Sequence, residues 1–168
     1  MGVRVVEFEK QGKERIAMSY SPGARLRALI ARPGAVAAPG VVDALAARLV
    51  KEAGFEAVYM TGDGSAAARL GMPDIGLMTM SEMVDNLARI ADASELPVVA
   101  DADTGYGGPI NVRRTVREYE RAGVAAMHLE DQVHPKRCGH LEGKRIVPAG
   151  EMVSKIKAAV DARRDPGL

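Results

Sequence analysis

The segment VVADADTGYGG, residues 98–108, carries the clearest structural signal in the sequence. It begins with a short apolar run, which predicts a buried strand. The run ends in Asp101 and Asp103, two carboxylates separated by a single residue, and a glycine-rich loop follows them. Residues two apart on an extended backbone point to the same side. We therefore expect both carboxylates to face one site at the carboxyl end of this strand.

Apolar runs and helical patterns alternate on both sides of this stretch. The strands are expected at residues 35–38, 55–60, 97–100 and 124–129. The helices are expected at residues 22–32, 40–53, 65–70, 79–93, 109–122 and 149–163. Because the strands are apolar throughout and do not alternate, we expect parallel strands covered on both faces. Such an α/β chain is either a doubly wound sheet or a (β/α) barrel.

Polar residues follow three successive strands and favour the barrel. They lie at residues 61–63, 101–103 and 130–131. Barrel enzymes build their sites at the carboxyl ends of several strands, whereas a doubly wound sheet concentrates its site at one switch point, often with a glycine fingerprint. The segment GYGGP lacks that fingerprint. We therefore predict a TIM (β/α)8-barrel type, of which this chain holds only the first four or so β/α units.

The number of strands sets the expected domain organisation. A closed barrel needs eight strands in about 250 residues, and this chain of 168 residues supplies four. We expect residues 1–20 to be an N-terminal extension and residues 21–168 to be the incomplete amino-terminal half of a barrel. A half-barrel exposes strand edges and an open core. We therefore expect a fragment, a homo-oligomer or a chain that pairs with a complementary half-barrel.

Composition excludes several classes of protein. Lys and Arg (23) nearly balance Asp and Glu (22), and only six residues are Phe or Tyr, with no Trp. This argues against binding to nucleic acid or to an anionic membrane surface. One cysteine cannot form an internal disulfide. No apolar stretch approaches the roughly 20 residues that span a bilayer, and the first residues have no signal-peptide core, so we expect a cytoplasmic protein.

The paired aspartates are the strongest candidates for a metal site. Two carboxylates in one low-dielectric site need a proton or a cation, and Mg²⁺ is held by one or two carboxylates with several waters. Glu130 ends the next strand and is placed to join Asp101 and Asp103. The alternative is that the aspartates cap the following helix or pair with its arginines, Arg113 and Arg114.

A polar loop, VHPKRCGHLEGKR at residues 133–145, contains the single cysteine, Cys138. Long loops at a barrel mouth are often lids. Neighbouring cations stabilise a thiolate, which suits a nucleophile or a proton carrier. A basic, solvated loop with an incidental cysteine is an equal alternative. One Cys with scattered His gives no recognised zinc-ligand spacing.

Weaker signals lie elsewhere in the chain. The segment at residues 61–64, Thr-Gly-Asp-Gly, could present backbone N–H groups to an anion, although glycines after strands are commonly only turns. Asp74 alone reads as a loop residue. His128, within the last strand, reads as a packed, hydrogen-bonded histidine more than as a ligand.

Four segments taken in order resemble the isocitrate lyase / phosphoenolpyruvate mutase superfamily, and most of all its methylisocitrate and 2,3-dimethylmalate lyases. They are TGDGSAAARLGMPDIG, VVADADTGYGG, HLEDQ and PKRCGH. The resemblance runs from about residue 24 to residue 168 and leaves residues 1–20 uncovered.

The resemblance implies a TIM barrel that holds Mg²⁺, with Mn²⁺ as a substitute. The implied metal-site residues are Asp101, Asp103, Glu130 and Asp74. The implied substrate-binding residues are Thr61, Gly62 and Asp63, for the 2-oxo-acid end, with Arg137 and Gly139 from the lid. The implied catalytic residues are Cys138, Lys136 and His140, from the lid motif of the lyases.

The implied chemistry is a retro-aldol cleavage of a 2-hydroxy di- or tricarboxylate. Loss of the hydroxyl proton breaks a C–C bond and gives a 2-oxo acid and a carboxylate enolate, whose carbon Cys138 would protonate as a general acid. The cysteine-bearing lid favours this lyase over the alternative, a phosphoenolpyruvate mutase-like enzyme acting on a P–C bond. A non-catalytic, truncated half-barrel is the third hypothesis.

Overall fold

The structure, a computed structural model, describes residues 21–168. The predicted N-terminal extension, residues 1–20, lies outside the described residues. Four parallel strands form one sheet in the order in which they follow one another in the chain. They are β1 (Gly40–Val41), β2 (Val58–Met60), β3 (Val98–Asp101) and β4 (Ala126–His128).

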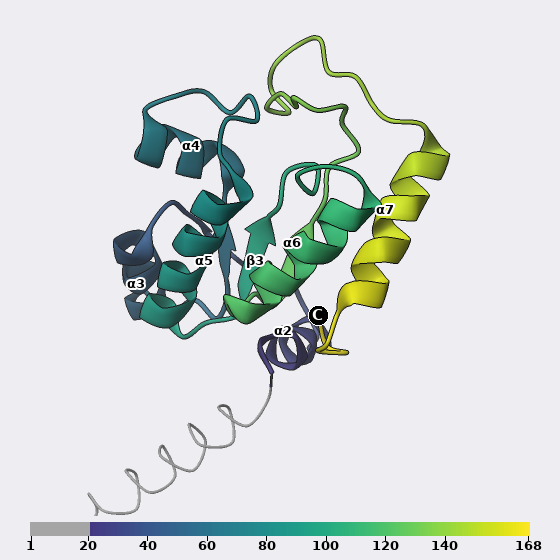
Figure 1. Cartoon of the computed structure of the whole chain (residues 1–168). Coiled ribbons are helices and arrows are strands. Elements are labelled where there is room, and N and C mark those ends of the chain that lie inside the picture. The colour runs from purple at the N-terminus through teal and green to yellow at the C-terminus, as the bar shows by residue number, and fades with distance from the viewer. Residues whose placement is uncertain (1–20) are drawn as a thin grey trace, which may run out of the picture.

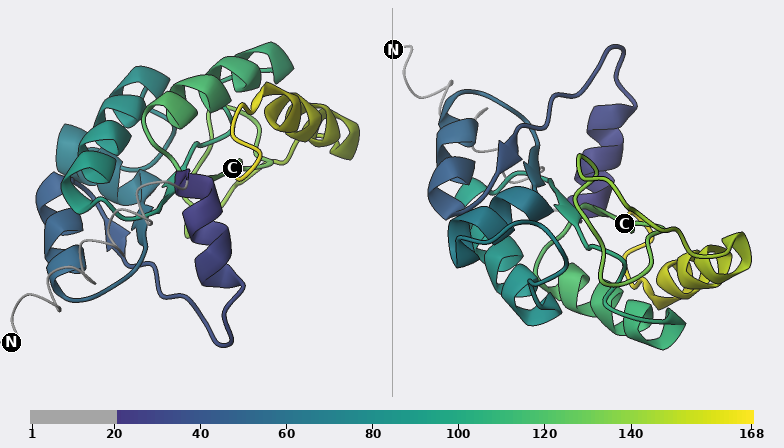
Figure 2. Two further views of the ribbon diagram at one scale, coloured as in Figure 1. Left: turned by 90° about the horizontal axis from the view of Figure 1, so that it is seen from below. Right: turned by 90° about the horizontal axis from the view of Figure 1, so that it is seen from above.

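Helices connect the strands and cover mainly one face of the sheet (Figure 1). They are α2 (Pro22–Ile30), α3 (Ala44–Glu52), α4 (Gly62–Leu70), α5 (Met80–Ser94), α6 (Pro109–Arg121) and α7 (Ala149–Ala162). Figure 2 shows α3, α5, α6 and α7 in an arc along the outside of the curved sheet, with α2 on its other side. This is the arrangement of consecutive β/α units in a barrel. None of the described helices has the length and apolar character needed to cross a membrane.

The main core lies between the sheet and this arc of helices. Val58, Met60, Val98 and Ala100 point from β2 and β3 into it and have no exposed surface. Leu87 of α5 is also fully buried there. Burying an aliphatic side chain of this size contributes about 1.5–3 kcal/mol. The other face of the strands is therefore free to carry the polar residues of a site.

Local sequence signals mark where two helices begin, α5 after β2 and α6 after β3. Thr79 and Glu82 form the predicted capping box at the start of α5: Glu82 N donates to Thr79 Oγ1 (3.3 Å), and Thr79 N donates to Glu82 Oε2 (2.8 Å). This exchange satisfies donors that a helix start leaves without partners. Pro109 occupies the first position of α6, where its missing N–H costs nothing.

The first strand is not where the sequence analysis placed it. Residues 35–38 are irregular, and the strand is Gly40–Val41, inside the predicted helix 40–53. Asp43 begins the helix, because its side chain accepts a hydrogen bond from Ala46 N (2.8 Å). The strand has only two residues, too short for its apolar pattern to stand out.

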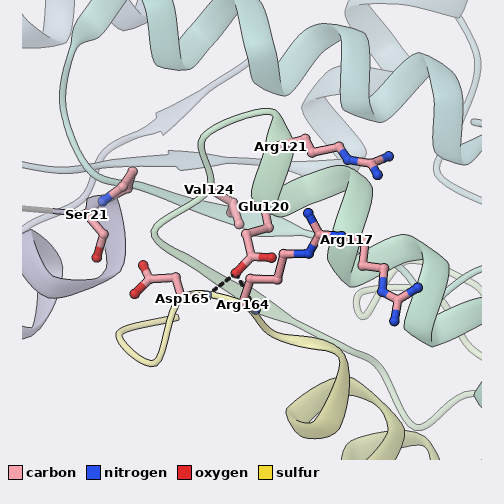
Figure 3. A pocket seen from close by; sticks show the side chains of 8 residues that line it. Ser21, Arg117, Glu120, Arg121, Val124, Arg164 and Asp165 are labelled. Atoms are coloured by element: carbon pink, nitrogen blue, oxygen red, sulfur yellow. Dashed lines mark hydrogen bonds between the residues drawn. The ribbon is translucent and has the colours of Figure 1, made fainter.

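The end of the sheet where the strands begin is closed by α2. Its Leu26 packs against Ala57 and Ala125, which immediately precede β2 and β4. Below α6, Glu120 Oε1 accepts a hydrogen bond from Arg164 N (2.8 Å) in a shallow pocket also lined by exposed arginines (Figure 3). This end holds the layers together, and the candidate site lies at the opposite end.

Candidate functional site

Asp101 and Asp103 meet through a turn and not through strand alternation, which corrects the predicted geometry. β3 ends at Asp101, and Asp103 has a φ of 46°, in the left-handed region. Its backbone N–H donates to Asp101 Oδ1 at 2.8 Å, so the first carboxylate holds the turn that presents the second. Both residues are 6% exposed. The predicted juxtaposition is present, although its cause is different.

The beginning of α4 lies against Asp101. Thr61, the residue before the helix, caps it by accepting a hydrogen bond from Gly64 N (3.2 Å). The helix begins at Gly62, three residues earlier than expected. A Cβ on Gly62 would lie 2.4 Å from Asp101 Oδ2, so only glycine fits here. The predicted substrate-binding segment therefore borders the acidic residues directly.

Lys136 is the central cation of the site. Its Nζ lies 2.6 Å from Asp74 Oδ2, 2.8 Å from Asp103 Oδ1 and 3.7 Å from Glu130 Oε1, and its side chain is 1% exposed. Four elements of the chain thus meet at one ammonium group. A buried charge of this kind is stable only when it is compensated. The sequence predicted Lys136 as a lid residue but did not reveal this pairing, which joins residues 62 positions apart.

His128 compensates the remaining carboxylate. Its Nε2 lies 3.3 Å from Asp101 Oδ1, and its ring stacks on Tyr59 with a centroid separation of 5.6 Å. The residue is exposed, and it is hydrogen-bonded as the sequence indicates, since its Nε2 also lies 3.3 Å from Tyr59 Oη. The aspartates do not pair with Arg113 or Arg114 among the described contacts, and α6 has no side-chain cap.

These contacts shift the pKa values of the acidic groups in different directions. Burial acts to raise the pKa of Asp101, but its hydrogen bond with His128 holds that pKa below its usual value. Burial raises the pKa of Asp103 and of Glu130, only partly offset by Lys136. The hydrogen bond to Asp101 raises the pKa of His128. Asp101 is therefore the carboxylate best held in its charged form.

Gln132 organises the loop that carries Lys136, and sequence reasoning missed it. Its Nε2 donates to Glu130 Oε2 (2.8 Å) and to Arg137 O (2.8 Å), while its Oε1 accepts from Arg137 N (3.1 Å). The residue is 7% exposed. A buried amide with all these partners fixes the loop relative to Glu130. The only sequence signal for Gln132 is its place at the end of the segment HLEDQ, two residues after the predicted site residue Glu130.

Cys138 lies beside the acidic cluster, the group formed by Asp74, Asp101, Asp103 and Glu130. Its backbone N–H donates to Asp74 O (2.9 Å), and its Sγ lies 3.5 Å from His140 Nδ1. The predicted substrate residues Arg137 and Gly139 bond within the loop: the Arg137 guanidinium donates to Glu142 O (3.1 Å), and Gly139 O accepts from Lys144 Nζ (2.7 Å). Neither contact joins them to the acidic cluster.

The residues present fit a hard divalent cation. Asp101, His128 and Glu130 each place one ligand atom within 4.8 Å of the others. Asp103 Oδ1 is buried and has no hydrogen bond of good geometry within residues 21–168, although Lys136 Nζ is close to it. A set dominated by carboxylate oxygens suits Mg²⁺ or Mn²⁺.

Comparisons with known proteins agree with this arrangement of fold and site. The family model for phosphoenolpyruvate phosphomutase matches residues 26–168. The chain belongs to this family. A 2,3-dimethylmalate lyase of Eubacterium barkeri is 56% identical over 143 residues, 85% of this chain and 50% of that protein. A 2-methylisocitrate lyase of Shewanella oneidensis is 45% identical over 90% of this chain and 52% of its own length.

Solved structures show the same fold. A 2,3-dimethylmalate lyase superposes with a TM-score of 0.81 at 50% identity, over 86% of this chain and 49% of that one. A phosphonopyruvate hydrolase in complex with oxalate and Mg²⁺ has a TM-score of 0.78 at 31% identity, over 88% of this chain and 50% of that one. The predicted α/β barrel type and superfamily are confirmed. The chain spans about half the length of the curated relatives it matches.

Proposed function

We propose that this chain forms the metal- and lid-bearing part of a C–C lyase. The substrate would be a 2-hydroxy di- or tricarboxylate of the 2-methylisocitrate or 2,3-dimethylmalate type, and the products a 2-oxo acid and a carboxylate. The observation that carries the proposal is the contact of Lys136 with Asp74 and Asp103 (2.6 and 2.8 Å). This contact holds the cysteine-bearing loop against the acidic cluster. A reaction that uses both Cys138 and a metal at the cluster would require the loop and the cluster to lie this close.

The metal would be held at the acidic cluster. The residues that would hold it directly or through water are Asp101, His128, Glu130, Asp103 and Asp74. A bound Mg²⁺ would act as a Lewis acid on the substrate's oxygen and stabilise the negative charge that develops there. The ammonium group of Lys136 would neutralise part of the negative charge of Asp74 and Asp103 beside the metal.

The first turn of α4 would bind the carboxylate end of the substrate. Helix N-termini attract anions through their free N–H groups and the helix dipole. Gly62 lets this turn approach Asp101, so a carboxylate bound there would also border the metal. The exposed side chain of Asp63 projects from the same turn and would restrict which substrates approach.

The cysteine would complete the reaction by protonating the enolate carbon. Asp74 O holds the backbone of Cys138 over the cluster, and His140 Nδ1 at 3.5 Å from Sγ can return the proton to the thiol after each turnover. General acid catalysis of this kind contributes about 10²–10⁴-fold to a rate.

The test is release of a 2-oxo acid from 2,3-dimethylmalate, 2-methylisocitrate and isocitrate, with phosphonopyruvate as the probe for the mutase alternative. We expect release that a chelator stops and that Cys138→Ser reduces at least 100-fold, while the loop control His134→Gln retains it. Consumption of phosphonopyruvate in preference to the hydroxy acids, or release that ignores both chelator and Cys138→Ser, would overturn the proposal.

A further inference from the structure

A second group of metal-ligating side chains lies next to Lys136. Asp63, Asp74 and Cys138 each place one ligand atom within 4.8 Å of the others. His140 stands beside this group, with its Nδ1 3.5 Å from Cys138 Sγ. The group shares Asp74 with the acidic cluster but differs from it in chemistry, because it combines sulfur with carboxylate oxygen and has an imidazole nitrogen beside the sulfur.

We propose that this group is a second metal site, specific for thiophilic divalent ions such as Zn²⁺. Three ligands lie within 4.8 Å of one another, Cys138 Sγ and one carboxylate oxygen each from Asp63 and Asp74, and His140 Nδ1 would complete the set by turning toward them. Zinc is commonly bound by four such ligands in a tetrahedron. Mg²⁺ prefers oxygen ligands, whereas a thiolate is a soft ligand that favours Zn²⁺.

The sulfur and nitrogen already stand at a coordination distance from one another. Zn–S bonds of ~2.3 Å and Zn–N bonds of ~2.0–2.1 Å at a tetrahedral angle place the two ligand atoms about 3.5 Å apart. The observed separation of Cys138 Sγ and His140 Nδ1 is 3.5 Å. An ion bound to Cys138 Sγ therefore has His140 Nδ1 within reach as a further ligand.

Asp74 fixes the position of the site relative to the fold. Its Oδ2 is bound to Lys136 at 2.6 Å, and its carbonyl oxygen accepts the hydrogen bond from Cys138 N. Its other carboxylate oxygen is the one available to an ion. Asp63 and His140 are exposed and Cys138 is half-buried, so ions reach these ligands directly from solvent.

Sequence spacing could not reveal this site. Cys138 and His140 are only two residues apart, and the two aspartates are more than 60 residues away, Asp63 in the first turn of α4 and Asp74 in the loop after that helix. The ligands meet because the cysteine-bearing loop lies over the turn that contains Asp74. The absence of a recognised zinc spacing is therefore consistent with a zinc site made by the tertiary structure.

Occupancy of the site would switch off the cysteine. On coordination the thiol releases its proton to solvent and the thiolate binds the ion, so no S–H remains to be donated. This consequence, inhibition of turnover, rests on the proposed function. The site itself does not, because metal binding can be measured without any substrate.

The experiment is a titration of the untagged 168-residue chain with Co²⁺, a spectroscopic substitute for Zn²⁺. We expect a thiolate-to-cobalt charge-transfer band that saturates at one equivalent and is abolished by Zn²⁺ but not by excess Mg²⁺. Cys138→Ser should remove the band, and His140→Gln and Asp63→Asn should each weaken Co²⁺ binding about tenfold or more. His134→Gln and Asp131→Asn, which change exposed loop residues outside the site, should leave the affinity unchanged.

The absence of a thiolate band in the wild-type chain would overturn the proposal. So would a band whose affinity is unaffected by both His140→Gln and Asp63→Asn, because that result would show a lone thiol binding the metal. Circular dichroism of each variant confirms that it is folded. A failure here leaves the chelator-sensitive release of 2-oxo acid untouched, so the two proposals fail separately.

Discussion

The acidic cluster and the cysteine-bearing loop differ in how they are built. Asp101 and Asp103 belong to the end of a core strand and are each 6% exposed, with charges already compensated by His128 and Lys136. In the loop, Cys138 is half-buried and His140 is exposed. The acidic cluster is therefore part of the fold, whereas the loop is joined to it by a few contacts, above all those of Lys136.

The largest expected effect comes from removing the negative charge of Asp101. Asp101→Asn retains the size of the side chain but removes the carboxylate that is best held in its charged form. We expect affinity for Mn²⁺ to fall about 100-fold or more, measured by equilibrium titration. The control is Asp92→Asn, which removes an exposed acidic group of α5. Equal affinity of the two variants would show that the cluster is not the metal site.

The second prediction concerns the connection between the two regions. Lys136→Met leaves Asp74 and Asp103 buried without their cation. Breaking one side of a buried ion pair costs about 3–5 kcal/mol, so we expect a loss of this size in the free energy of unfolding, measured with urea. Lys144→Met, which changes an exposed lysine of the same loop, should cost less than about 1 kcal/mol. Similar losses in both variants would contradict the role of Lys136.

The third prediction tests the close approach of α4 to the cluster. Gly62→Ala places a Cβ 2.4 Å from Asp101 Oδ2 and must move one of the two. We expect a loss of about 1–3 kcal/mol in stability together with weaker Mn²⁺ binding. Gly150→Ala is the matched control, because a Cβ at this position in the first turn of α7 meets nothing within 4 Å. A stable Gly62→Ala variant with normal binding would contradict the observed packing.

The smallest expected effect is the pH dependence contributed by His128. Its pKa is raised in the folded state, so its contribution to stability is complete below its ordinary pKa of about 6.5 and is lost as the pH rises through the raised value. The side chain is 43% exposed, and solvent screening limits the effect to below about 1 kcal/mol. We expect His128→Gln to remove this fall in the free energy of unfolding. An unchanged pH profile would contradict the pairing with Asp101.

Much of the fold follows from local sequence patterns. The strands β2, β3 and β4 lie within or next to their predicted ranges, and the capping box at Thr79 and the proline at 109 locate two helix starts. These signals depend on residues only a few positions apart. The two-residue strand β1 is too short for a recognisable pattern, and the apolar residues 35–38 predict a strand where the chain is irregular.

The sequence could predict which residues make up the candidate site, but not which of them contact one another. Asp101 and Asp103 stood out as carboxylates after an apolar strand. The two carboxylates meet through a turn that depends on the positive φ of Asp103, and the strand pattern of the sequence did not predict that conformation. His128 and Lys136 act through partners on other strands and loops, and such contacts depend on the tertiary packing of the chain.

Electron paramagnetic resonance of Mn²⁺ added to this chain, with and without oxalate, tests the proposed metal site directly. Oxalate is a planar dicarboxylate that resembles the 2-oxo acid product in its adjacent carboxylate and carbonyl oxygens. The account predicts one Mn²⁺ bound per chain, tighter binding when oxalate is present, and loss of both effects in Asp101→Asn. A spectrum of free Mn²⁺ throughout the titration, with or without oxalate, would contradict a metal-dependent site at the ends of these strands.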